Sequence, residues 1–282
     1  MGVELIRRPH RYLLVGAVLP VLVLVAIAAG FHPGRARGPM FDEEFNGPGL
    51  DGDRWATCFF WRAESCSNGS SDRQSYVPGN VSTSDGVLSL TARRGSTRRF
   101  LQDGTSGMVP YSSGMISSEG RFQFRYGYVE IRARVPKGRG LWPALWLMPA
   151  DHSWPPEIDI MENVGQETDR VTFTNHPPDA ANKVITVAGT DYAAGFHTFA
   201  VDWQPDHLTY LVDGVPRGSL TDHIPSKAMY VIANLGVGGP WPGNPDAATA
   251  FPATFAVDYI KVWKSGGGIP VGAYVPTAGR AS

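Results

Sequence analysis

Short stretches of alternating apolar and polar residues recur from about residue 40 to residue 264, and they restrict the fold more than any other feature of the chain. Each is rich in β-branched or aromatic residues and is bounded by Gly, Pro, Asp or Asn, as expected for strands that bury one face. The clearest examples are Val87–Thr91, Tyr128–Val135, His197–Trp203 and Val257–Trp263. Apart from an apolar N-terminal run, no long segment shows a helical repeat. The pattern predicts an all-β domain over residues 40–264.

Turn signals and composition favour a β-sandwich. Asp85-Gly86 and Asp213-Gly214 each separate two such stretches, and Asp-Gly is a preferred hairpin turn. The 282 residues include 33 Gly and 23 Pro, a mixture that suits many short strands joined by turns. No internal repeat is visible. We therefore predict one antiparallel two-sheet sandwich.

The N-terminus has the features of an export segment. Three arginines precede an uncharged apolar run over residues 13–30, as in a secretory signal peptide. The run is also long enough to cross a bilayer, although Pro20 interrupts it, so residues 1–30 are either a cleaved signal or a membrane anchor. We expect a linker over residues 31–39, a flexible tail over residues 265–282, and an extracellular or cell-surface location. Membrane contact is expected only through this N-terminal segment.

The two cysteines, Cys58 and Cys66, are close together in the sequence. Export would place them in an oxidising compartment, where a disulfide closing a small loop is favoured over two free thiols. By loop entropy such a bond contributes about 2–3 kcal/mol.

Charge composition restricts the partners. The formal net charge is −1 and no long basic run is present, which excludes the clustered positive surface that a nucleic-acid partner requires. We expect a monomer with a neutral ligand.

The segment from Glu157 to Glu162 interleaves three acids with three apolar residues. On a regular strand Glu157 and Asp159 would share one face, whereas Glu162 would point into the core. Burying an unpaired carboxylate costs several kcal/mol. A β-bulge near Met161 would return Glu162 to the face of the other two acids and leave Ile158 facing the core.

Three crowded carboxylates raise one another's pKa, which opposes folding but suits glycoside hydrolysis. That reaction needs one carboxylate ionised and another held protonated. An edge strand with solvated acids is one alternative, but the interleaved isoleucines favour a half-buried strand. A calcium site is another, although such sites usually draw their acids from loops.

The acidic segment resembles the catalytic signature of glycoside hydrolase family 16, in the longer form found in laminarinase-like members. Three further stretches resemble this family in the same order along the chain: residues 140–149, 196–214, and 234–243 with 257–263. The resemblance covers roughly residues 40–264. It implies a jelly-roll, concanavalin A-like sandwich with a concave glycan cleft. It also implies Glu157 as nucleophile, Glu162 as general acid/base and Asp159 between them, with no cofactor for catalysis.

Five residues outside this segment are predicted to bind substrate. Trp142 and Trp146 share one face of a strand, where they are either sugar platforms or core residues. Trp241 lies in a Gly/Pro-rich loop and is either a platform or a loop anchor. The family has a histidine near the acid/base, which His176 matches, although a structural histidine fits equally well. Asn234 opens the stretch of residues 234–243, which resembles one of the family's last strands.

Many members of the family hold a structural calcium between the first and last strands. The matching positions here are Glu43 or Glu44, the backbone of Gly86, and Asp258. A salt bridge or a turn cap would satisfy Asp258 equally well.

The resemblance therefore predicts an endo-acting retaining hydrolase of β-1,3-glucan or mixed β-1,3/1,4-glucan. A transglycosylase would use the same residues with a sugar as acceptor. A non-catalytic glycan-binding sandwich is a further alternative, but such a protein has no use for three crowded acids.

Overall fold

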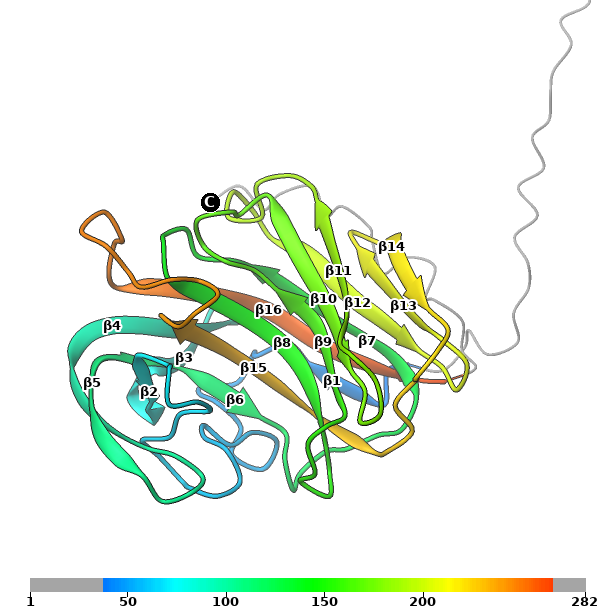
Figure 1. Ribbon diagram of the computed structural model, residues 1–282, viewed down its shortest axis with the longest axis horizontal. Helices are drawn as coiled ribbons and strands as arrows, with labels where there is room; N and C mark the ends of the chain where they lie inside the picture. Colours follow the sequence, from blue (N-terminus) through cyan, green and yellow to red (C-terminus); the bar gives the residue numbers. More distant parts are fainter. Residues whose placement is uncertain (1–37, 266–282) are drawn as a thin grey trace, which may run out of the picture. The chain divides into compact units, whose positions relative to one another are not determined.

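The computed structural model describes residues 38–265, whose strands form two β-sheets packed face to face (Figure 1). The predicted export segment, most of the linker and the tail beyond Ser265 lie outside the described residues. Within residues 38–265, no helix is long and apolar enough to cross a membrane.

The larger sheet has ten strands, and all its pairs are antiparallel except β2 with β5. Its main path runs through β14 (Val215–Leu220), β13 (Leu208–Val212), β12 (His197–Trp203), β7 (Gly127–Arg134), β16 (Ala253–Lys264), β4 (Val87–Phe100), β5 (Ser106–Ser113) and β2 (Gln74–Tyr76). Two strands lie off this path: β1 (Phe41–Glu43) pairs with β16, and β3 (Val81–Ser84) pairs with β4.

The second sheet has six strands, all antiparallel, and in Figure 1 its strands β8 and β15 lie in front of β16. The order is β11 (Lys183–Ala188), β10 (Arg170–His176), β9 (Glu157–Glu162), β8 (Leu141–Pro149), β15 (Met229–Val237) and β6 (Met115–Ser117). A short 3-10 helix, η1 (Pro78–Asn80), precedes β3. The predicted two-sheet all-β sandwich is confirmed.

Alternating side chains fill the space between the sheets. In β12, Phe199, Val201 and Trp203 are fully buried, as the two-residue repeat predicts. Phe173 of β10 stacks on Tyr210 of β13 with ring centroids 4.9 Å apart, so that an aromatic pair joins the two sheets. Each such buried side chain stabilises the fold by roughly 1.5–3 kcal/mol.

Both Asp-Gly pairs form the hairpin turns that the sequence predicts. Asp85 and Gly86 connect β3 to β4 with φ angles of 53° and 74°, and Asp213 and Gly214 connect β13 to β14 with φ angles of 51° and 72°. Two successive positive φ angles match the twist of a two-residue hairpin, and Asp followed by Gly tolerates them best.

Candidate active site

A β-bulge interrupts β9 where the carboxylates require it. Asp159 pairs with Trp146 of β8, but the next paired residues are Met161 and Leu145. Ile160 is therefore the extra residue on the β9 side. The ladder between β9 and β10 shifts at the same place. The β-bulge predicted near Met161 is confirmed.

The bulge sorts the six residues of β9 into two groups. Ile158, Ile160 and Met161 are fully buried in the main core. The three acids, Glu157, Asp159 and Glu162, line a common cleft on the opposite face of the six-stranded sheet. Trp142 lines the same cleft. An even alternation would have buried Glu162 among apolar side chains, at a cost comparable to a domain's stability margin.

Neighbouring strands and loops hold the first two acids. The indole N–H of Trp154 donates to Oε2 of Glu157 at 2.8 Å. Nε2 of His176, on β10, lies 2.8 Å from Oδ2 of Asp159 and 3.5 Å from Oε1 of Glu157. His176 is thus hydrogen-bonded at the Glu157 end of the cluster, whereas the resemblance placed it near Glu162.

Two other side chains hold Glu162. The indole N–H of Trp142 donates to its Oε1 at 3.0 Å, and the hydroxyl of Thr174 donates to its Oε2 at 3.4 Å. Both contacts stabilise the ionised form and so lower the pKa of Glu162. Burial acts in the opposite direction and is the larger influence.

Burial raises the pKa of all three carboxyls. For Glu157, burial and then the charge of Asp159 raise the pKa well above its usual range. Burial and the charge of Glu162 do the same for Asp159. Burial, with the charge of Glu157 second, raises the pKa of Glu162 to about 7. The three acids therefore cannot all be ionised at neutral pH, and the site retains protons there.

The tryptophans predicted to bind sugar occupy different environments. Trp142 is half-buried beside the acids, and its ring meets that of Trp241 edge-on at 5.4 Å. Trp241 is 46% exposed at the cleft. Trp146 is only 6% exposed and donates its N–H to Oδ1 of Asn234 at 2.7 Å. The hydrogen bond orients Asn234, which also lines the cleft.

The predicted disulfide is present and supports one wall of the cleft. Cys58 and Cys66 are bonded to each other. The loop that they close carries Phe59, which lines the cleft and packs edge-on against Trp146. Tyr76 lines the same wall.

Several of these contacts could not have been found from the acidic segment. Phe59 and Tyr76 are distant from it in sequence and carry no distinguishing pattern. Of the contacts described above, only that of Trp154 had a signal in the sequence, because Trp154 stands three residues before Glu157.

Glu157, Asp159 and His176 each present an atom within 4.8 Å of the others, a spacing that could also hold a cation.

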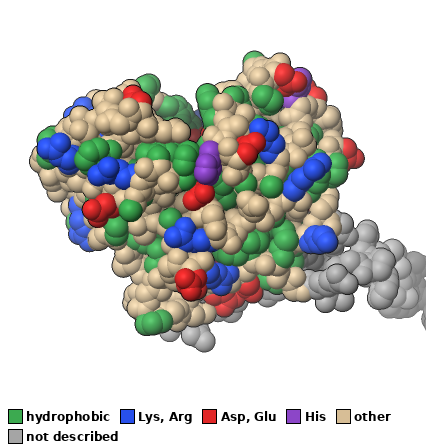
Figure 2. Space-filling model, turned by 90° about the horizontal axis from the view of Figure 1, so that it is seen from below, with side chains coloured by type: hydrophobic (Ala, Val, Ile, Leu, Met, Phe, Trp, Pro, Cys, Tyr) green, Lys and Arg blue, Asp and Glu red, His purple; other side chains and the backbone are tan. Residues whose placement is uncertain are grey.

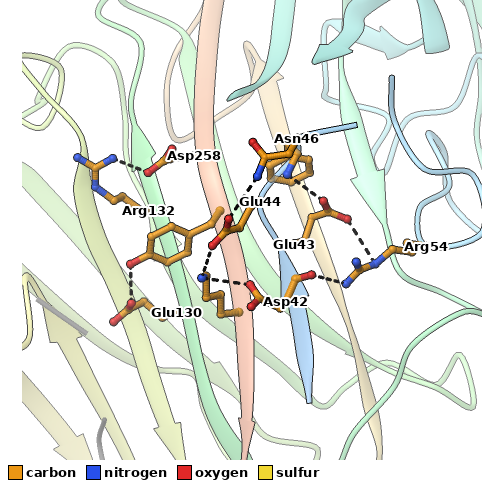
Figure 3. Close-up of polar contacts among 11 residues, drawn as sticks. Asp42, Glu43, Glu44, Asn46, Arg54, Glu130, Arg132 and Asp258 are labelled. Atoms are coloured by element: carbon orange, nitrogen blue, oxygen red, sulfur yellow. Dashed lines mark hydrogen bonds and ion pairs between the residues drawn. The ribbon is translucent and has the colours of Figure 1, made fainter. Parts of the chain in front are cut away.

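The residues predicted to bind calcium hold cationic side chains instead (Figure 3). Asp258 is ion-paired with Arg132, and Glu44 accepts from the ammonium of Lys261 at 2.6 Å. Glu43 accepts the indole N–H of Trp55 at 3.0 Å. These contacts correspond to the salt-bridge alternative. The donor set as arranged does not fit a calcium ion, because the side chains of Arg132 and Lys261 already pair with its carboxylates.

Charges are mixed on the surface that Figure 2 shows. Lysine and arginine side chains alternate there with aspartate and glutamate, and no broad patch of one sign is visible. That face offers no electrostatic footprint for a polyanion.

A cleft across one sheet of a β-sandwich, lined by crowded carboxylates and tryptophan, is the arrangement that glycoside chemistry uses. The comparison with protein families agrees: the model of the glycosyl hydrolases family 16 matches residues 69–261. The chain belongs to this family.

Individual relatives are similar over most of the described chain. Endo-1,3-1,4-beta-glycanase ExsH of Rhizobium meliloti is 34% identical over 242 residues, which cover 79% of this chain and 51% of that protein. A glucan endo-1,3-beta-glucosidase of Cryptopygus antarcticus is 32% identical over 262 residues, covering 79% and 90%. The structure of an endo-beta-1,3-glucanase from Pyrococcus furiosus superposes with a TM-score of 0.71 at 30% identity, covering 80% and 94%. The chain spans about half the length of the first curated relatives that it matches.

Proposed function

We propose that this chain is an endo-acting retaining glycosidase that cleaves β-1,3-glucan or mixed β-1,3/1,4-glucan. The bulge in β9 is the observation that carries the proposal, because it presents Glu162 on the same face as Glu157. The substrate class is taken from the activities after which the relatives are named.

In the first step an oxygen of Glu157 forms a bond to the anomeric carbon while the glycosidic C–O bond breaks. Glu162 passes its proton to the departing sugar oxygen. In the second step water attacks the anomeric carbon, its proton goes to Glu162, and the electron pair of the ester bond returns to Glu157. The pKa of about 7 supports Glu162 as the proton carrier near neutral pH.

The neighbours of Glu157 support its role as nucleophile. Burial and the charge of Asp159 are the larger influences and raise the pKa of Glu157, and His176 by charge and Trp154 by hydrogen bonding oppose them in favour of the ionised form. Asp159 lies between the two catalytic glutamates and contacts His176, so it can share the remaining proton. Trp142, Trp241 and Asn234 line the cleft where sugar rings would stack and hydrogen-bond.

We also propose that the chain acts outside the cytoplasm. The disulfide between Cys58 and Cys66 supports this location, because such bonds persist mainly in oxidising compartments.

Digestion of a panel of defined β-glucans and galactans, with product analysis and the anomeric configuration followed by NMR, tests the function. We expect oligosaccharides of retained configuration from β-1,3- or mixed-linkage glucan. Glu157→Gln should abolish turnover, because an amide cannot form the glycosyl-enzyme bond. Products of inverted configuration, or Glu157→Gln activity within a few-fold of wild type, would rule out the assigned roles.

A further inference from the structure

Two acidic side chains converge on a single nitrogen of His176. Its Nε2 lies 2.8 Å from Oδ2 of Asp159 and 3.5 Å from Oε1 of Glu157, and the three atoms lie within 4.8 Å of one another. His207 and His223 also have two acidic neighbours each, but in both residues the acids lie at opposite ring nitrogens. In the described part of the chain, His176 is therefore the one histidine at which an ion bound to a single nitrogen reaches two acids.

The six-stranded sheet holds these three side chains in place. Glu157 and Asp159 are two residues apart on β9 and so share a face. His176 is paired with Glu157 in the ladder between β9 and β10, and all three side chains line the cleft. The indole N–H of Trp154 occupies Oε2 of Glu157, which leaves Oε1 for another partner.

Permanent positive charge is missing beside the acids. The lining of the cleft includes one arginine, Arg170, and its guanidinium is paired with Glu167 at 3.5 Å. In the part of the chain that the structure describes, no lysine or arginine forms an ion pair with Glu157, Asp159 or Glu162. Like charges at close range destabilise one another, and a divalent cation would neutralise two of them.

The donor atoms select the kind of ion. An imidazole nitrogen with two carboxylate oxygens is a donor set typical of zinc, whereas calcium and magnesium prefer oxygen alone. Zinc holds such ligands at about 2.0–2.2 Å in a tetrahedron, so that neighbouring ligand atoms are about 3.3 Å apart. The 3.5 Å between His176 and Glu157 already matches this spacing, and Asp159 has to withdraw by only about 0.5 Å. The open cleft leaves the fourth position to solvent.

We propose that Glu157, Asp159 and His176 form a zinc site in the catalytic cleft, and that zinc bound there inhibits the enzyme reversibly. The inhibition rests on the proposed glycosidase function, whereas the binding of zinc does not. In the first step of that reaction an oxygen of Glu157 forms a bond to the anomeric carbon. An ion on Oε1 holds the electron pair that the oxygen would donate and fills the space beside the carboxylate.

Zinc titration of the full chain by isothermal calorimetry, without any glycan, tests the site directly. We expect a single saturable zinc ion per chain and no binding of magnesium under the same conditions. His176→Ala removes the nitrogen ligand, so zinc affinity should fall by more than the roughly ten-fold that loss of an outer partner causes. His207→Ala is the matched control, because His207 also has two acidic neighbours, and it should bind zinc as wild type does. Thermal melts report whether each variant folds.

Glu157→Gln gives a second test if His176→Ala does not fold, because it replaces a charged oxygen ligand with a neutral one and should also weaken binding. Wild type without saturable zinc binding, or a folded variant of either ligand that keeps wild-type affinity, would overturn the site. In the glucan assay zinc should lower the rate and EDTA should restore it, and zinc that binds without lowering the rate would overturn the inhibition. If wild type cleaves no glycan in the panel, the proposed function fails, and the calorimetric titration alone decides whether the zinc site exists.

Discussion

Replacing Glu162 with glutamine should make the protein more stable at pH 8 and leave its stability at pH 4 nearly unchanged. Burial is the main cause that raises the pKa of Glu162 from 4.5 to about 7, and the charge of Glu157 adds to it. Below pH 4.5 the carboxyl is protonated in both the folded and the unfolded protein. Above pH 7 it is ionised in both, but only the folded protein bears the cost. The wild type therefore loses stability relative to the variant as the pH rises between these values.

The difference in pKa corresponds to an upper limit of about 3 kcal/mol at pH 8, reduced by any relaxation of the neighbouring carboxyls. Urea unfolding of both proteins at pH 4, 6 and 8 measures it as a free energy of unfolding. Glu64→Gln, at an exposed glutamate, is the control and should show no such trend. If the stability difference between the two proteins stays constant from pH 4 to pH 8, ionisation of Glu162 in the folded protein carries no free-energy cost and the argument from burial is wrong.

Three further outcomes are expected. Reduction of the bond between Cys58 and Cys66 should lower the melting temperature by roughly 5–10 °C, from about 2–3 kcal/mol of loop entropy, and thiol titration of the native protein should find no free cysteine. Trp142→Phe removes a donor to Glu162, so the basic limb of the pH–rate profile should move to higher pH; an unchanged limb would contradict the contact. Calcium or a chelator should leave the melting temperature unchanged, because cationic side chains already hold the candidate carboxylates, and a calcium-dependent rise in melting would show that Lys261 gives way.

The sequence alone was sufficient for the sandwich and for the arrangement of β9. Alternation in segments such as His197–Trp203 has a two-residue repeat that only a strand satisfies. The bulge was predicted from the free-energy cost of burying an unpaired carboxylate, because the odd spacing between Asp159 and Glu162 would place Glu162 in the core of a regular strand. Both predictions depend on local pattern and a single physical cost, which a sequence displays directly.

Contacts between segments that are distant in the sequence could not be predicted from such local patterns. The burial of Trp146 depends on Phe59, which the disulfide-closed loop brings over β8. The partners of Asp258 and Glu44 depend on which cations the neighbouring strands carry at facing positions. Strand pairing far apart in the chain decides both, and periodicity within one strand carries no information about it.

The bulge in β9 has a consequence for how the length of this strand can vary over evolution. A strand shorter by one residue between Asp159 and Glu162 would be in phase with the two-residue repeat and would present the same three carboxylates without any irregularity. Deletion of one residue there would keep the three carboxylates in the cleft, but it would remove a side chain from the core. Ile160 and Met161 both fill it, and a missing side chain leaves a void that costs about 2–5 kcal/mol. Lineages that shorten or lengthen this strand should therefore show matching volume changes in the facing residues of the larger sheet, with activity retained throughout.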